Sequence, residues 1–107
     1  MKLYIITRSD LPAGARAAQA CHAMRQWSAD QPEEDRTWFE DSNTLVLLEA
    51  PDEPALEALL GRARDKDVPH AVFREPDLQD ALTAVAIGWK GRRLVSRLPL
   101  ALKERRA

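Results

Sequence analysis

Three polar side chains with chemically useful groups follow one another at intervals of three residues near the start of the chain. Arg16, Gln19 and His22 carry a guanidinium, an amide and an imidazole. Side chains three residues apart share one face of a helix, so a helix here would present the three groups together. The segment follows an apolar strand pattern, and open α/β sheets usually place their sites at such strand ends. On the other side of this helix, an apolar stripe is expected from Ala17, Ala20, Cys21 and Met24.

Carboxylates that could assist an imidazole lie in the loop before the last predicted strand. Glu75, Asp77 and Asp80 belong to this loop. If the preceding strand runs parallel to the first one, its end reaches the same edge of the sheet as the loop over residues 8–14, and a carboxylate there could reach the helix face that carries His22. A nearby carboxylate raises the pKa of a histidine and fixes its tautomer, which suits general-base work on a water molecule. The alternative is a solvated loop beside an ordinary surface or partly buried helix histidine.

Other reactive residues have simpler interpretations. Asp10 could cap the turn into the first helix, and His70 sits beside a proline at a strand start. Cys21 and His22 are adjacent, so on a helix they point about 100° apart and form no dyad. Cys21 falls on the apolar stripe and is expected to be a small buried hydrophobe. The sequence has no Gly-rich phosphate loop, CxxC, HExxH or GxSxG motif, and with two histidines and one cysteine we expect no metal.

The composition indicates one globular domain. The chain has 107 residues, of which 45% are hydrophobic and 31% charged. A net charge of -1 excludes a general polycation, so any RNA contact must come from a local patch. A single cysteine forms no internal disulfide and suggests a reducing compartment. We expect no signal peptide and no membrane span, and therefore a cytoplasmic protein with one domain over residues 1–107.

Strand and helix patterns alternate along the chain. Strands are expected over residues 3–7, 44–48, 68–73 and 83–89, and helices over about 14–29 and 53–65, the second capped by Asp52. Segment 30–41 is acidic and contains Pro32, so it is interpreted as a surface connection with Trp38 and Phe39 pinned to the body. Residues 92–102 could form a short helix that stops near Pro99, followed by a frayed charged tail.

The order β-α-β-α-β-β predicts an α/β fold. The first two crossovers favour parallel strands, and the short last connection favours an antiparallel pair. The result would be a single three-layer domain, a mixed four-stranded sheet with helices on its faces and a possible short C-terminal helix. The continuously apolar strand 44–48 is expected to be buried on both faces. The order of the strands stays open.

The run from Asp10 through Gly14 to Ala23 resembles the signature of the peptidyl-tRNA hydrolase type 2 family, which usually reads T-D-x-x-x-G-K-x-A-A-Q-x-x-H-A. Further similarities follow in the same order. Trp38 precedes the second strand, Ala50 to Glu53 (APDE) precedes a Leu-rich helix, and Thr83 to Gly88 resembles a last strand that usually reads T-V-L-x-I-G. The resemblance therefore covers nearly the whole chain.

The resemblance implies a hydrolase without metal or cofactor that cleaves the ester between a peptide and the 3′ ribose of tRNA. Carried over position by position, the matching site residues are His22, Gln19, Asp10 and Thr83. Arg74 matches a basic or polar position before the family's D-A-G-R-T-Q loop. The family usually forms dimers, so the resemblance also implies a homodimer.

Two positions depart from the family pattern. The lysine that follows the glycine is Ala15 here, and Arg16 lies one place later, about 100° around the helix. Arginine at that position is not an equivalent replacement. The family loop is replaced by a shorter segment, in which either Glu75 or Asp77 could stand for the loop aspartate.

The resulting hypothesis is an esterase in which water is activated near His22 and a carboxylate of Asp77 or Glu75. Thr83 and Gln19 would orient the water or the ester carbonyl. The arginines expected to meet the tRNA backbone are Arg8, Arg16, Arg25 and Arg74. Two alternatives stay open: a catalytically impaired member that binds RNA, and a dimeric regulatory or interaction module.

Overall fold

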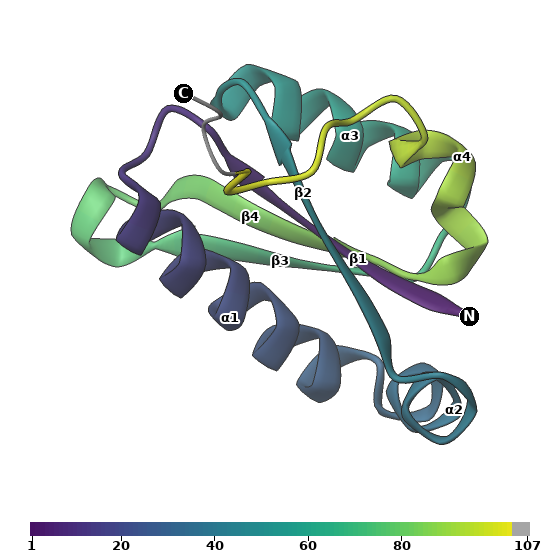
Figure 1. The fold of residues 1–107 in the computed structure, drawn as a ribbon. Coiled ribbons are helices and arrows are strands. Elements are labelled where there is room, and N and C mark those ends of the chain that lie inside the picture. The colour runs from purple at the N-terminus through teal and green to yellow at the C-terminus, as the bar shows by residue number, and fades with distance from the viewer. Residues whose placement is uncertain (104–107) are drawn as a thin grey trace.

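A computed structural model describes residues 1–103 and shows the α/β architecture that the sequence predicts (Figure 1). The strands are β1 (Lys2–Arg8), β2 (Thr44–Ala50), β3 (His70–Glu75) and β4 (Ala81–Ile87). The helices are α1 (Ala13–Asp30), α2 (Pro32–Asp41), α3 (Glu53–Asp65) and α4 (Arg92–Val95), with 3-10 turns over Pro76–Leu78 and Trp89–Gly91. Most of the predicted frayed tail, residues 104–107, lies outside the described residues.

The four strands form one mixed sheet in the order β2-β1-β4-β3. β1 and β2 are parallel, and β4 runs antiparallel to both β1 and β3. The predicted antiparallel pairing of the last two strands is confirmed. Because β4 is antiparallel to both of its neighbours, β1 and β3 share one direction and end at the same edge of the sheet. This shared edge brings the β1–α1 loop and the end of β3 together.

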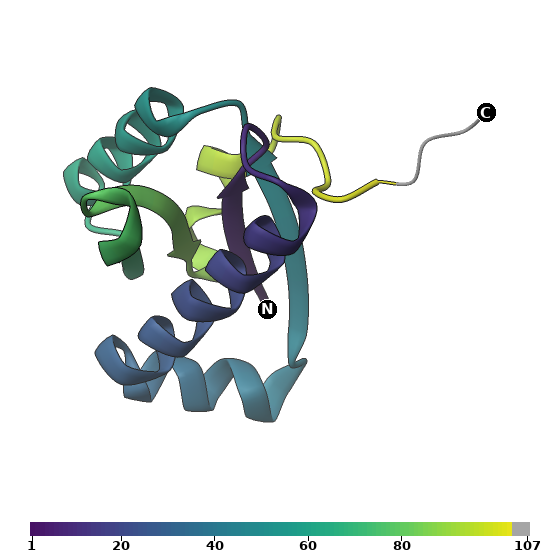
Figure 2. The same ribbon diagram turned by 90° about the vertical axis from the view of Figure 1, so that its left-hand side faces the viewer.

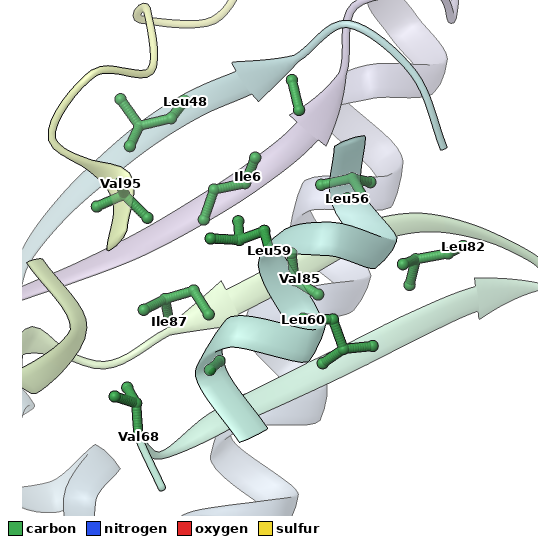
Figure 3. Close-up of a cluster of buried hydrophobic side chains, with 12 residues drawn as sticks. Ile6, Leu48, Leu56, Leu59, Leu60, Val68, Leu82, Val85, Ile87 and Val95 are labelled. Atoms are coloured by element: carbon green, nitrogen blue, oxygen red, sulfur yellow. The ribbon is translucent and has the colours of Figure 1, made fainter. Parts of the chain in front are cut away.

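Helices cover both faces of the sheet, so the predicted three-layer fold is confirmed. Figures 1 and 2 show α1 and α2 on one face and α3 and α4 on the other. Each face has its own apolar core. Leu3, Ile5, Ala23 and Trp27 are buried on the α1 side. The α3 side is larger and buries Ile6, Leu48, Leu56, Leu59, Leu60, Leu82, Val85, Ile87 and Val95 (Figure 3).

β2 is an outermost strand of the sheet and is partly exposed, contrary to the expectation that both of its faces are buried. Thr44 is exposed, and 47% of Leu45 is accessible to solvent. The apolar pattern wrongly indicated full burial, because some of these apolar side chains line a small groove at the surface. This groove of about 150 Å³ has an apolar lining that includes Leu45, Met24 and Cys21. Cys21 is therefore exposed and not the buried hydrophobe expected from the sequence.

Segment 32–41 forms helix α2, where the sequence analysis expected a connection. Pro32 occupies the first turn of this helix. Proline is tolerated there because the backbone N–H that it lacks would have no hydrogen-bond partner within the helix. Three acidic residues in the same turn favour the positive end of the helix dipole. Trp38 is buried, as expected, and donates its indole N–H to the Thr44 carbonyl at 2.8 Å. Phe39 is 64% exposed, so it is not pinned to the body.

The last two helices differ in how they are fixed. Asp52 caps α3, because its carboxylate accepts a hydrogen bond from the Ala55 N–H at 3.0 Å, as predicted. α4 is only four residues long and ends before Pro99. Residues after α4 then run along the outer edge of β2, where Leu100 forms an isolated antiparallel bridge with Leu48.

Candidate active site

The candidate site lies at the sheet edge where β1 and β3 end. β1 delivers Arg8 and the loop that contains Asp10, and β3 ends at Glu75. α1 begins after this loop, lies across one face of the sheet (Figure 1) and contains Gln19 and His22. The topology thus brings the start of the motif over residues 10–23 and the loop carboxylates to one end of the molecule.

A β-bulge at Thr83 shapes this site. Phe73 pairs with Ala84, but Arg74 pairs with Leu82, so Thr83 is the extra residue on β4. A bulge breaks the alternation of side chains and re-aims one of them, and bulges are common beside active sites. Because of the bulge, the side chains of Thr83 and Ala84 both face α1. In a regular strand, two consecutive side chains would point to opposite faces of the sheet.

Thr83 and Gln19 form the buried polar contact of the site. The Thr83 hydroxyl donates to Gln19 Oε1 at 2.7 Å, and the two residues are 0% and 7% exposed. Among the described residues, nothing accepts a hydrogen bond from Gln19 Nε2. Since the hydroxyl fixes the amide oxygen, the amide N–H groups are left to donate to another molecule.

Leu82 is held from both sides, and this fixes the strand next to Thr83. Its N–H donates to Glu53 Oε2 at 2.6 Å, and its carbonyl accepts from Arg8 Nη1 at 3.2 Å. Glu53 belongs to the first turn of α3 and lies 29 residues away in the sequence. Nothing local in the sequence signalled this role for Glu53, which the sequence analysis missed.

His22 is exposed and held by an aromatic contact. Its imidazole stacks on the ring of Phe73 with 4.4 Å between centroids and 14° between planes. No ion pair joins it to Glu75 or Asp77 in residues 1–103. Stacking fixes the plane of the imidazole, and neither ring nitrogen forms a hydrogen bond within residues 1–103. The pairing of His22 with a carboxylate stays a prediction.

The two loop carboxylates occupy different environments. Glu75 is half-buried at the end of β3, whereas Asp77 is exposed in the 3-10 turn that follows. Gln79 and Asp80 close the turn with φ angles of 57° and 59°, in the left-handed region that non-glycine residues adopt uncommonly. The Asp80 N–H donates to the Glu75 carbonyl at 3.0 Å, which ties the turn together.

Arg8 and Asp10 form a two-pronged ion pair at the end of β1. Arg8 Nε and Nη2 donate to the two carboxylate oxygens of Asp10 at 2.9 and 3.0 Å. These hydrogen bonds hold the pKa of the Asp10 carboxyl below its ordinary value and raise the pKa of the Arg8 guanidinium. Asp10 therefore holds Arg8 beside Leu82 and makes no side-chain cap for α1.

Two other predicted tRNA-binding arginines are also paired. Arg16 Nη1 donates to Glu49 Oε2 at 3.1 Å, and Arg74 Nη2 donates to Glu57 Oε1 at 3.0 Å. Arg25 is exposed on α1 and forms no ion pair within the described chain. The candidate edge therefore carries polar groups in abundance but little unbalanced positive charge.

Neither a metal cluster nor a membrane helix is found in residues 1–103. No group of three His, Cys, Asp or Glu side chains there is arranged to hold a metal ion. None of the helices in this part combines the length and the apolar character needed to cross a membrane.

Comparisons with known proteins agree with the geometry. The sequence model of the family described as "Peptidyl-tRNA hydrolase PTH2" matches residues 1–104. A human protein named "Putative peptidyl-tRNA hydrolase PTRHD1" is 30% identical over 95 residues, which cover 78% of this chain and 67% of the human protein. A solved structure of a protein of unknown function, Atu0240 from Agrobacterium tumefaciens strain C58, superposes with a TM-score of 0.66. It is 14% identical and covers 92% of this chain and 96% of its own, so it shows similarity of fold.

Proposed function

Because the chain belongs to the peptidyl-tRNA hydrolase PTH2 family, we propose that it cleaves the ester between a peptidyl or N-blocked aminoacyl group and the tRNA 3′ end. The observation that carries this proposal is the buried hydrogen bond from Thr83 to Gln19 beside His22. This bond orients the amide of Gln19 as a hydrogen-bond donor, and the imidazole of His22 supplies a base. Ester hydrolysis requires both groups. The reaction is proposed to need neither metal nor cofactor.

In this proposal, His22 acts as the general base. A nitrogen of its exposed imidazole accepts a proton from water as the water oxygen attacks the ester carbonyl carbon. The tetrahedral intermediate then breaks its bond to the 3′ ribose oxygen, which leaves with the tRNA and takes the proton back from the imidazolium. The stack against Phe73 fixes the ring plane, which favours a single approach direction. Either Asp77 or Glu75 is proposed to orient the protonated ring. Loss of a positioned base typically lowers the rate by about 10²- to 10⁴-fold.

Gln19 has the complementary role toward the ester oxygen. Its free amide N–H donates to the carbonyl as negative charge develops there, and such a donor is typically worth about 10²- to 10³-fold in kcat. Thr83 is a positioning residue, since it acts through the Gln19 amide. Asp10 is a positioning residue too, because it fixes Arg8, and Arg8 fixes the Leu82 carbonyl next to the bulge.

The tRNA backbone is proposed to approach the same edge. Arg25 is available for phosphate contact, whereas Arg8, Arg16 and Arg74 would exchange or share their carboxylate partners on binding. Phosphate contacts release counterions, so affinity should fall steeply with salt. A cytoplasmic location and a homodimer complete the proposal, and sedimentation equilibrium would test the latter.

The test is release of free tRNA from a purified N-acetyl-aminoacyl-tRNA. We expect turnover by the wild type and a loss of at least about 100-fold in His22→Ala. His70→Ala is the matched control, because this second histidine lies at the opposite end of β3 and should leave turnover unchanged. Comparison of Glu75→Gln with Asp77→Asn would identify the assisting carboxylate. Equal turnover in His22→Ala and the wild type would contradict the proposed base.

One observation favours a second candidate, a member that binds RNA without hydrolysing the ester. Ala15 stands where the family has a lysine, and Arg16 is turned toward Glu49. Under this alternative the wild type is inactive, Ala15→Lys gains turnover, and tRNA binding survives in His22→Ala. Inactivity of all variants together with absence of tRNA binding would favour a regulatory or interaction module.

A further inference from the structure

The positive charge of this chain is distributed unevenly. No Asp or Glu occurs between Asp80 and Glu104 in the sequence, although Lys90, Arg92 and Arg93 fall in that interval together with Arg97. The arginines at the candidate active site are mostly neutralised by carboxylates. Lys90 pairs with Glu34 at 3.8 Å, whereas Arg92, Arg93 and Arg97 form no ion pair within residues 1–103, so the segment after β4 carries unbalanced positive charge away from the site already described.

Topology places these cations at the opposite end of the sheet from His22. β4 runs antiparallel to β1, and Ile87 at its end pairs with Tyr4 near the start of β1. The following turn and α4 consequently lie beside the N-terminal end of β1 (Figure 1). We call Lys2, Arg92 and Arg93 the α4 basic surface. All three are exposed, and none forms an ion pair within residues 1–103.

Two grooves meet on this surface. One has a volume of about 450 Å³ and is lined by Tyr4, Arg92 and Arg93 among others. The other has a volume of about 420 Å³ and is lined by Lys2, Trp89 and again Tyr4 and Arg92. Both Tyr4 and Trp89 are partly exposed. Guanidinium and ammonium groups around aromatic rings form the combination that binds phosphates and stacks on bases.

We propose that the α4 basic surface binds the RNA backbone of the substrate away from its reacting 3′ end. The proposal rests on the proposed tRNA ester substrate and adds a second contact at the far end of the molecule. The chain carries a net charge of -1, so an RNA-binding role needs local cations that are free of carboxylates. Arg92 and Arg93 meet this requirement better than the paired arginines of the catalytic edge.

The first test measures the binding of uncharged tRNA by fluorescence polarisation over a range of salt concentrations. Each lost phosphate contact lowers the slope of log Kd against log salt by about 0.7 to 0.9. We expect the double variant Arg92→Gln/Arg93→Gln to lower this slope by about 1.5 and to weaken binding by roughly tenfold at low salt. A charge-matched control, Arg36→Gln/Arg62→Gln, removes exposed arginines from α2 and α3 and should keep the wild-type slope.

The second test separates this surface from the reaction centre. With full-length N-acetyl-aminoacyl-tRNA, the Arg92→Gln/Arg93→Gln variant should raise KM about tenfold and keep kcat. With an N-acetyl-aminoacyl ester of the 3′-terminal trinucleotide, which cannot reach α4, neither constant should change. Lys2→Gln removes one charge at a third exposed position and should give a smaller rise in KM for the full-length substrate only.

The outcomes distinguish this proposal from the proposed activity. tRNA binding that depends on Arg92 and Arg93 without hydrolysis by the wild type would support the surface and reject the activity. Hydrolysis with an unchanged slope and KM in the double variant would overturn the surface alone. An equal loss in the charge-matched control would reduce the effect to net charge and also overturn it, as would the absence of tRNA binding by the wild type.

Discussion

The hydrogen bond between Thr83 and Gln19 allows a prediction of how much one substitution lowers the free energy of unfolding. Thr83→Val keeps the branched shape of the side chain and removes only the hydroxyl that lies 2.7 Å from Gln19 Oε1. Because both residues are buried, water cannot readily replace the lost donor. The variant therefore loses a short hydrogen bond and also leaves a buried amide oxygen without a partner.

The expected cost is about 2 kcal/mol in the free energy of unfolding, within the ~1–3 kcal/mol typical of a buried polar group left unpaired. The entropy of unfolding scales with chain length at about 2.1 cal/mol/K per residue. For 107 residues, a loss of about 2 kcal/mol corresponds to a fall in Tm of ~9 °C. Urea unfolding followed by circular dichroism, together with thermal melting, would measure both quantities.

Thr7→Val provides a matched control in the neighbouring strand. Thr7 is also fully buried, but its hydroxyl lies 3.4 and 3.5 Å from its two carbonyl acceptors, longer than an ordinary O–H···O bond. We expect its loss to cost less than about 1 kcal/mol. Gln19→Met completes a double-mutant cycle with Thr83→Val. Additivity of the two changes within ~0.3–0.5 kcal/mol, or equal costs for the two threonines, would refute the reasoning.

Two further predictions concern the ion pair and the packing. Since Arg8 lowers the pKa of Asp10, this carboxylate stabilises the fold above its unfolded pKa and loses that contribution as the pH falls through its folded pKa. Asp10→Asn should therefore be less stable than the wild type in urea at pH 7, with the gap narrowing as the pH falls below about 4, the ordinary pKa of an aspartate. A constant gap would contradict this prediction. Gly88→Ala would place a Cβ 2.9 Å from the buried Trp27 ring and should cost ~1–3 kcal/mol. By contrast, Gly61→Ala on α3 meets nothing within 4 Å and should stabilise by about 0.5–1 kcal/mol, so thermal melting should shift the two variants in opposite directions.

Much of the fold could be predicted because its elements have local signals. Period and composition located the four strands, and Asp52 correctly marked the start of α3. Helix α2 was missed because Pro32 was interpreted as a breaker, although proline is well suited to a first helical turn. Cys21 and Leu45 were placed wrongly because an apolar stripe reveals a packing direction but not whether another element covers it.

The details of the candidate site depend on contacts between distant parts of the chain. The partners of Arg16 and Arg74 are Glu49 and Glu57, at separations of 33 and 17 residues, and no spacing rule reaches that far. The bulge that turns Thr83 toward α1 is likewise a property of the β3–β4 register and not of a motif. The sequence could therefore identify the candidate side chains. It could not predict which carboxylates pair with the arginines or which way the Thr83 side chain points.

The segment after α4 has a consequence for how the protein behaves in concentrated solution. An unpaired strand edge can recruit a strand from another molecule and begin aggregation. Along β2, the Glu49 N–H donates to the Pro99 carbonyl at 3.0 Å, and the Ala101 N–H donates to the Leu47 carbonyl at 2.9 Å. These bonds occupy one half of the edge and leave the half around exposed Leu45 open. A chain cut before Pro99 would expose the edge along its full length, and we expect it to self-associate by strand addition.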